Sequence, residues 1–169
     1  GYAINSANLI RKIRELAQIF LKVATSISSS LDVKAILQAM TEDLVKSLQI
    51  KAAAVRLIDE DSRTLKSVAS FGLSEKYLNK GPVTADKNIA SALKGKTIVI
   101  QNIAKDAGVQ HKKEKIEEGI VSMLYVPIRS KESVIGVLVV YSDRPRIFTE
   151  EEITVVTALA FQGGLAITN

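Results

Sequence analysis

The 169-residue chain contains no cysteine and no tryptophan, and its one histidine is His111. Without thiols it has no disulfide framework, cysteine nucleophile, thiolate metal site or thioether-linked chromophore. One histidine supports neither a Cys–His triad nor a His-rich metal site, and Gly-rich phosphate loops are absent as well. These absences predict a protein that is not an enzyme and that carries no metal or other resident cofactor.

The chain also lacks a long hydrophobic run. No apolar stretch approaches the roughly 18 residues that span a bilayer, and the first residues show no signal-peptide pattern. We therefore expect no membrane contact by this fragment and a cytoplasmic location, which the absence of cysteine also fits. The chain begins without methionine and its last residues continue a helical pattern, so we expect a piece of a longer protein.

A net charge of +5 and a pI of about 9.4 raise the question of a nucleic-acid partner. The lysines, however, are spread along the chain, and aromatic residues make up only 5% of it. The densest cluster, Lys-Lys-Glu-Lys at 112–115, is followed at once by Glu117 and Glu118. This pattern is typical of a solvated helix face, and it predicts no nucleic-acid partner.

Helices are expected at both ends of the chain. Between residues 10 and 27 apolar side chains recur at alternating steps of three and four, the spacing of a heptad seam. Asp32 is in position to cap a second helix that continues to Leu48. The last helix begins with Thr149 and Glu152, which have the spacing of a capping box.

The middle of the chain predicts a sheet that is covered on both faces. Apolar and β-branched residues predict strands at 52–58, 64–71, 97–101, 122–128 and 134–141. The last of these is apolar on both parities, so both of its faces must be buried. The terminal helices supply one layer, and only the mostly irregular stretch 72–120, with short helices at 86–93 and 111–118, is left for the other. The sequence predicts an α+β fold, an antiparallel sheet with terminal helices on one face and a roof of loops and short helices over a pocket on the other.

Several segments resemble those of GAF domains. The runs SMLYVPI at 122–128 and VIGVL at 134–138 are similar to the central strand pair of that family, and FTEEE at 148–152 is similar to the start of its closing helix. Upstream, SSSLD at 28–32 and LID at 57–59 resemble its N-terminal half. The resemblance covers nearly the whole chain. It implies a GAF/PAS-like sheet, a ligand pocket on one face and a parent protein in two-component or cyclic-dinucleotide signalling.

The resemblance does not identify a ligand, because the family includes cyclic-nucleotide, bilin, haem and amino-acid binders and members with empty pockets. Of the positions that match the cyclic-nucleotide pattern, only Phe148 agrees. Covalent bilin attachment and GAF-type methionine-sulfoxide reduction both need cysteine. Haem would have to use His111, which we expect at the surface of a polar helix. The expected ligand is therefore an unidentified small molecule.

Arg56 is the most unusual residue of the predicted strands, because a covered charge costs several kcal/mol unless it is paired. By strand alternation it shares a face with Ala54 and Ile58, and the resemblance turns that face toward the pocket. A guanidinium there could clamp a carboxylate or phosphate. The alternatives are a salt bridge to an internal carboxylate and an arginine at the surface.

The expected ligand site consists of Arg56, Ala54 and four further residues. The resemblance places Val139 and Tyr141 on the pocket side, where a tyrosine at a strand end also suits an amphipathic core position. Ser70 and Ser122 carry hydroxyls that could donate to a ligand or to the backbone.

The terminal helices predict a parallel homodimer. The seam of the first helix is longer than one small domain needs, and the last helix repeats the same spacing. The positions expected in a four-helix bundle between two copies are Ile10, Ile13, Ala17, Phe20, Ala24, Ile27, Val156, Ala160, Gly163 and Ile167. Close helix approach would explain the adjacent glycines at 163 and 164, each of which costs a helix about 1 kcal/mol relative to alanine. The alternative is a monomer whose own sheet uses both seams.

The expected organisation is a signalling and dimerisation helix at 1–30 and a GAF domain at 31–169 that ends in an output helix. The predicted function is a regulatory sensor. It binds a small molecule and relays the signal through the paired helices to an output domain in the same parent chain. The alternative is a purely structural dimerisation domain with a collapsed pocket.

Overall fold

A computed structural model of the chain describes residues 2–29, 32–131 and 133–168, without the side chains of 2–6 and 23–29. Its centre is a five-stranded sheet in the order β2-β1-β5-β4-β3, in which every neighbouring pair is antiparallel. The strands are β1 (Ala52–Asp59), β2 (Thr64–Phe71), β3 (Ile98–Ile100), β4 (Ser122–Ser130) and β5 (Ser133–Ser142). The α+β fold and the expected strands are therefore confirmed.

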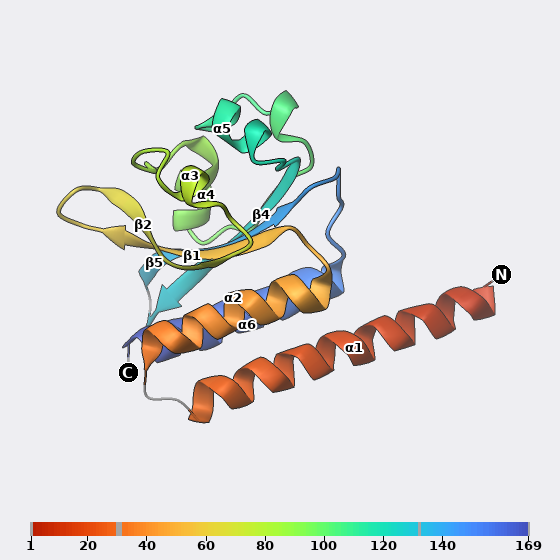
Figure 1. Cartoon of the computed structure of the whole chain (residues 1–169). Coiled ribbons are helices and arrows are strands. Elements are labelled where there is room, and N and C mark those ends of the chain that lie inside the picture. Colours follow the sequence, from red (N-terminus) through yellow and green to blue (C-terminus); the bar gives the residue numbers. More distant parts are fainter. Residues whose placement is uncertain (1, 30–31, 132, 169) are drawn as a thin grey trace.

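Three long helices lie on one side of this sheet, namely α1 (Tyr2–Ser29), α2 (Val33–Leu48) and α6 (Glu150–Thr168) (Figure 1). The predicted caps of α2 and α6 are present. Asp32 accepts from the backbone N–H of Lys34 at 3.0 Å. Thr149 and Glu152 exchange hydrogen bonds between side chain and backbone at 3.0 and 3.1 Å. Among the described residues, no helix combines the length and hydrophobicity that crossing a membrane requires.

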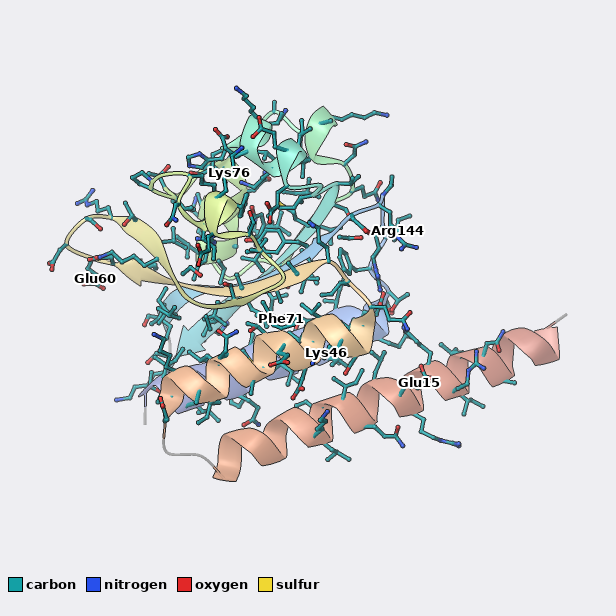
Figure 2. The ribbon with its side chains drawn as sticks, in the orientation of Figure 1. Glu15, Lys46, Glu60, Phe71, Lys76 and Arg144 are labelled. Atoms are coloured by element: carbon teal, nitrogen blue, oxygen red, sulfur yellow. The ribbon has the colours of Figure 1, made fainter. Side chains whose placement is uncertain are left out.

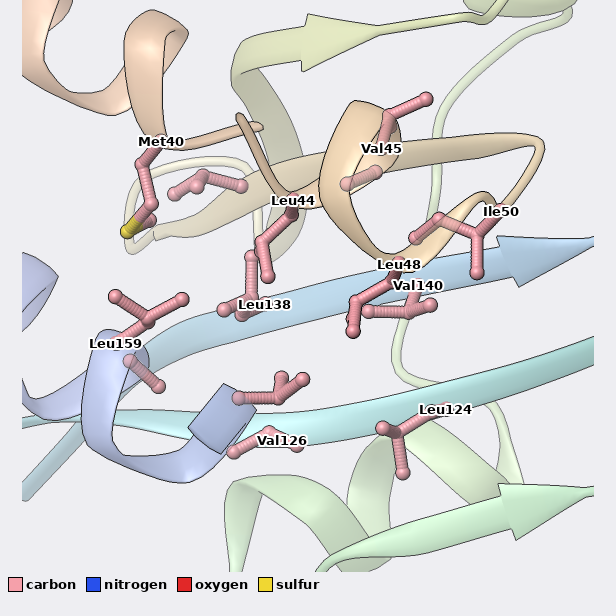
Figure 3. Close-up of a cluster of buried hydrophobic side chains, with 14 of the residues drawn as sticks. Met40, Leu44, Val45, Leu48, Ile50, Leu124, Val126, Leu138, Val140 and Leu159 are labelled. Carbon is pink, nitrogen blue, oxygen red and sulfur yellow. The ribbon is translucent and has the colours of Figure 1, made fainter. Parts of the chain in front are cut away.

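The first hydrophobic core fills the space between the sheet and helices α2 and α6. In Figure 3 Leu44 of α2 points toward Leu138 of β5 and Leu48 toward Val140, and Met40 of α2 and Leu159 of α6 belong to the same cluster. These side chains are at most 4% exposed, and burying each stabilises the fold by about 1.5–3 kcal/mol. This face of the sheet is therefore closed by the protein's own helices.

Helix α1 lies outside this layer and packs mainly on α6 and α2, whereas the sequence predicted both terminal helices on the sheet (Figure 1). Leu16 is its buried contact with the core, and Ile19 and Phe20 pack beside it. Lys12 lies 3.8 Å from Glu152 at the start of α6. Lys22 also lies 3.7 Å from Asp43 of α2, so apolar contacts and ion pairs with both neighbouring helices hold α1.

The second hydrophobic core lies on the opposite face, beneath the segment from 72 to 120. This segment contains three short helices and one 3-10 turn, namely α3 (Glu75–Leu78), α4 (Lys87–Leu93), α5 (Lys112–Glu117) and η1 (Ile103–Lys105). Tyr77, Ile89 and Ile103 from this roof pack against Val139 and Tyr141 of β5. The predicted two-sided burial of β5 is confirmed, and everything that covers its second face is short or irregular (Figure 1).

Candidate functional site

Arg56 lies on the roof face of β1, as the strand alternation predicts. It stands opposite Val137 of β5 and Ser67 of β2, with a bulge in the β1–β2 pairing between Val55 and Arg56. Val137 belongs to the second core, and the Arg56 side chain is only 6% exposed. The interpretation of Arg56 as a surface arginine is therefore wrong.

Arg56 takes part in no ion pair among the described residues. No carboxylate in that part of the chain lies within 4.0 Å of its guanidinium. Its surroundings are instead three tyrosines, Tyr77, Tyr125 and Tyr141. Burial lowers the pKa of Arg56, but the interactions with Tyr141, Tyr77 and Tyr125 together outweigh this effect and raise it. Burial raises the pKa of Tyr77 and of Tyr125 far above 10, so both phenols are neutral. The guanidinium is therefore a buried cation, and its neighbours Tyr77 and Tyr125 carry no charge that would offset it.

Two lysines bring further positive charge to the same place. Lys115 of α5 is only 4% exposed, and its Nζ donates to the backbone oxygen of Gln110 at 2.7 Å. Lys80, which follows α3, holds its Nζ over the ring of Tyr77, 3.9 Å from the centroid. This Nζ is buried and has no hydrogen-bond partner among the described residues. Burial, together with the charge of Arg56, lowers the pKa of Lys80 to about 7 and that of Lys115 to about 8.

The acidic residues near these lysines are engaged elsewhere. Asp86 caps α4 through Ile89 and accepts from the backbone and side chain of Gln110. Glu118 accepts from the backbone N–H and the hydroxyl of Ser74 at 2.7 and 2.6 Å. These bonds tie the parts of the roof to one another. Among the described residues the carboxylates form no ion pair with the three cations, but the charge of Asp86 acts to raise the pKa of Lys115 and that of Glu118 acts to raise the pKa of Lys80.

Two hollows border the roof on either side of the segment 77–83. A groove of about 760 Å³ runs along the edge strand β2 and is lined by Arg56, Ser67 and Ser70 together with parts of 78–83. A hollow of about 470 Å³ between α3 and α5 is lined by Tyr77 and Lys80, among others. The groove therefore reaches Arg56 from one side of the segment 77–83, and the hollow reaches Lys80 from the other side.

The remaining predicted site residues fall into three environments. Ala54, Val139 and Tyr141 lie with Arg56 on the roof face, but each is at most 1% exposed within the packed second core. Ser70 lines the groove. Ser122 is buried and donates to the backbone oxygen of Arg144 at 2.7 Å, the backbone alternative expected for it. The centre of the roof face, where a pocket was predicted, is packed by the aliphatic, tyrosine and methionine side chains of the second core, and the two hollows lie at the margins of the roof.

Sequence reasoning missed Lys80, Lys115, Tyr77 and Tyr125. Tyr125 is opposite Val139 in the β4–β5 register, so its alternation with Met123 carried a usable signal. The sequence carried no such signal for the two lysines, because both lie in short polar segments that show neither the periodicity of a strand nor that of a helix. The expectation of a solvated face at 112–115 is wrong for Lys115, which points inward.

His111 is partly buried and does not lie free on the surface. Its Nε2 is 2.8 Å from the backbone oxygen of Pro82, a contact that joins α5 to the segment over Arg56. Among the described residues, no group of three or more acidic or histidine side chains is arranged to hold a metal ion. Charged side chains of both signs are spread over the outer surface, as Figure 2 shows for Glu15, Glu60, Lys76 and Arg144.

The surface available to a second copy differs from the predicted one on α6. Val156, Ala160 and Gly163 are buried in the first core, and Ile167 packs against it, so these four positions are used by the chain's own fold. On α1, Ile10 and Ile13 are 58% and 47% exposed. Ala17 is exposed as well, while Phe20 is half-buried against the core. The side chains of Ala24 and Ile27 lie outside the described residues.

An apolar groove of about 440 Å³ lies between α1 and α6. Its walls include Ile13, Ala17 and Phe20 of α1 and Val155 and Ala158 of α6. Phe161 of α6 adds an exposed ring on the same helix. The exposed apolar surface of the terminal helices therefore lies mainly on α1 and on the outer side of α6.

The sequence model of the GAF domain family matches residues 30–168. A comparison with curated proteins finds no match. Among solved structures, the GAF domain of a phosphoenolpyruvate-protein phosphotransferase from Coxiella burnetii has 18% identity and a TM-score of 0.83, covering 92% of this chain and 94% of that chain.

Two other similar structures come from proteins of different kinds. A domain of a putative two-component sensor histidine kinase from Sinorhizobium meliloti 1021 has 25% identity and a TM-score of 0.69, covering 80% of this chain and 90% of that one. The free methionine-R-sulfoxide reductase from Neisseria meningitidis, in complex with its substrate, has 17% identity and a TM-score of 0.78, covering 92% and 89%. The fold is therefore shared by regulatory, sensory and catalytic proteins.

Proposed function

The chain belongs to the GAF domain family, and on that premise we propose that it is a regulatory sensor module that binds a small molecule beneath its roof. It then passes the signal through the terminal helices of a homodimer to an output domain in the same parent protein. The similar histidine-kinase domain supports a two-component setting, and the reductase structure supports a small molecule as the ligand. We also propose cyclic-dinucleotide signalling as a second kind of system in which the parent protein could act.

The observation that carries this proposal is the buried guanidinium of Arg56. The guanidinium is 6% exposed and has no carboxylate within 4.0 Å among the described residues, which is uncommon for a charge inside a protein core. An anionic group of a ligand would compensate the charge, and the groove along β2 reaches Arg56. The arginine is therefore better explained by binding than by folding.

A path for the signal leads from Arg56 to the helices. Arg56 lies at the β1–β2 bulge, and β1 is entered directly from α2 through the tight turn at Gln49, whose φ is +52°. The opposite face of β1 contributes Ala53 and Val55 to the core that holds α2 and α6. A ligand that shifts β1 would therefore shift the surface on which α1 rests.

The alternative, a purely structural dimerisation domain, is favoured by a different observation. The centre of the roof face is packed, with Ala54, Val139 and Tyr141 at most 1% exposed, as a collapsed pocket would be. In that case Arg56 is held only by its tyrosine neighbours and no ligand is needed. The two functions differ in whether any metabolite stabilises the fold.

A thermal-shift screen with neutral, cationic and anionic metabolites separates them. A ligand at a hundred times its dissociation constant adds about 2.7 kcal/mol. Each kcal/mol raises the melting temperature of a domain of this size by about 2–4 °C. We expect at least one compound to give such a shift, and Arg56→Met to lose it while folding normally. Arg144→Met, at an exposed arginine, is the matched control and should keep the shift. No shift with any compound would favour the structural alternative.

A further inference from the structure

Two apolar stripes face solvent beside each other, one on α1 and one on α6. We propose that the groove between them holds helix α1 of a second copy, in a parallel arrangement in which Arg14 of each copy pairs with Glu150 and Glu151 of the other. The inference rests on the homodimer of the proposed function. It names the interface, the orientation of the two copies and the charges that set this orientation.

The stripe on α1 is formed by Ile10, Ile13 and Ala17, which follow one another at steps of three and four residues. Ile10 and Ile13 are 58% and 47% exposed, and neither belongs to the first core. Leu16, on the adjacent side of the helix, makes the contact with that core instead. The helix therefore has one side for its own domain and another that is left over for a partner.

The stripe on α6 is a second row, distinct from the buried one. Thr154, Ala158, Phe161 and Leu165 follow at steps of four, three and four, on the side of the helix opposite the buried Val156. Phe161 and Leu165 are 57% and 41% exposed, and aromatic rings are among the side chains that protein interfaces bury most often. This row therefore offers a surface on which a partner helix can rest.

The hollow of about 440 Å³ between α1 and α6 joins the two stripes. Its walls include Ile13 and Ala17 from the first stripe and Thr154 and Ala158 from the second. Facing helices with alternating steps of three and four form holes into which the side chains of a further helix with the same spacing pack. Helix α1 of a second copy has this spacing, and in a two-fold dimer each copy places its α1 in the groove of the other.

The charge at one end of the groove sets the direction of the incoming helix. Glu150 and Glu151 line the groove there, and neither forms an ion pair among the described residues. They belong to the first turn of α6, which Lys12 contacts through Glu152 at 3.8 Å, so they stand at the level of residues 12–14 of α1. The groove therefore suits a helix that brings a basic side chain to this end.

Arg14 is the residue of α1 that suits these carboxylates. It is exposed, follows Ile13 directly at the border of the stripe, and forms no ion pair among the described residues. In a parallel pair, a residue that flanks the seam of one helix lies beside the flank of the other at the same level. Arg14 of each copy then meets the start of α6 in the other. In an antiparallel pair it would lie toward the apolar end of the groove, near Phe161.

The chain has no cysteine, so single cysteines report the orientation directly. Like positions of the stripe face each other in a parallel dimer, so Ile10→Cys and Ala17→Cys should each form a disulfide between copies under mild oxidation. These positions are about 10 Å apart along the helix, so an antiparallel dimer can link at most one of them to itself. Asn8→Cys and Gln18→Cys, on the polar side of α1, are the matched controls and should stay unlinked.

Sedimentation equilibrium of charge variants measures the ion pair. Arg14→Gln removes two symmetric pairs from the dimer and should raise its Kd by about three- to tenfold. In a variant that carries Glu150→Gln and Glu151→Gln, the same change should alter the Kd by less than about twofold, because the partner carboxylates are gone. Arg11→Gln is the control and should leave the Kd nearly unchanged, since Arg11 lies 3.9 Å from Glu15 of its own helix.

Three results would overturn the proposal. A dimer that links at fewer than both stripe positions, or that links at a control position, refutes the parallel arrangement while the homodimer of the relay stands. Equal effects of Arg14→Gln with and without the two carboxylates refute the ion pair. A monomer at high concentration refutes the interface and with it the homodimer, whereas the ligand-binding part of the proposed function is tested separately by the thermal-shift screen.

Discussion

Three basic residues are buried or hold a buried nitrogen on this side of the protein, namely Arg56 on β1 and Lys80 and Lys115 in the roof. Burial disfavours the charged form of each, and for the two lysines it lowers the pKa, so folding alone does not explain why cations occupy these positions. Arg56 could be found from the sequence because it interrupts an apolar strand whose alternation is plain. The lysines could not, because a lysine in an irregular segment gives no periodic indication of which way it points.

The stability of the ligand-free protein should rise with pH because of Lys80. Burial lowers its pKa from 10.5 to about 7, so between these values the unfolded chain binds more protons than the folded protein. The free energy of unfolding therefore increases from about pH 7 to about pH 10, and below pH 7 the folded state retains the full penalty of the buried charge. Lys115 acts in the same direction from about pH 8.

Urea unfolding at pH 6.5 and pH 9 measures this effect. Lys80→Met should be more stable than the unaltered protein at pH 6.5 and should show a smaller rise toward pH 9. Lys80→Met with Lys115→Met should show the smallest rise. Lys113→Met provides the baseline, because that lysine is exposed. If all four proteins gained the same stability with pH, the lysines would not be buried as described.

At the scale of single elements, helix α6 shows what its sequence pattern could and could not indicate. Its three-and-four spacing predicts one apolar face, and that face exists. The spacing is the same whether the face packs on a sheet or on a partner helix, so the assignment of Val156, Ala160 and Gly163 to a dimer did not follow from it. The capping box, by contrast, is a local pattern with one geometric solution, and it was predicted correctly.

The two adjacent glycines of α6 should respond in opposite ways to alanine. At Gly164 a Cβ would lie 2.1 Å from the backbone oxygen of Arg129 on β4, so the helix would have to move off the sheet. At Gly163 the nearest atom would be the Cε of Met40 at 3.5 Å, an ordinary contact.

Gly164→Ala should therefore destabilise the protein by several kcal/mol, in the range of severe core overpacking. Gly163→Ala should be neutral or stabilising by up to about 1 kcal/mol, since alanine is the better helix former. Thermal or urea unfolding of the two variants checks this, and equal effects would show that α6 does not approach β4 as closely as described. The sequence indicated that close approach was one reason for a glycine pair, but not which of the two was required.

At the scale of the whole molecule, the sheet and its two coverings followed from the sequence, while the outer position of α1 did not. A helix with a wide apolar stripe fits a sheet and a helix layer equally well. In the structure α2 and α6 already cover the sheet, so α1 packs on them and keeps Ile10 and Ile13 at the surface. This exposed row is where a second copy should bind.

Charges in that row should separate a dimer from a monomer. Ile10→Glu with Ile13→Glu places two carboxylates on exposed apolar positions without entering the core, unlike a change at the half-buried Phe20. Sedimentation should show a dimer for the unaltered protein and a folded monomer for this variant. Asn8→Glu with Gln18→Glu adds the same charge on the polar side of α1 and should remain dimeric. An unaltered protein that is monomeric at high concentration would remove the homodimer from the proposed relay.

The central claim is that the roof holds a small molecule against Arg56, and native mass spectrometry tests it most directly. The protein is purified without dialysis against competing anions and compared with Arg56→Met and Arg144→Met prepared in the same way. We predict an additional small-molecule mass on the unaltered protein and on Arg144→Met, and its absence from Arg56→Met with folding preserved. The same additional mass on Arg56→Met would contradict the claim.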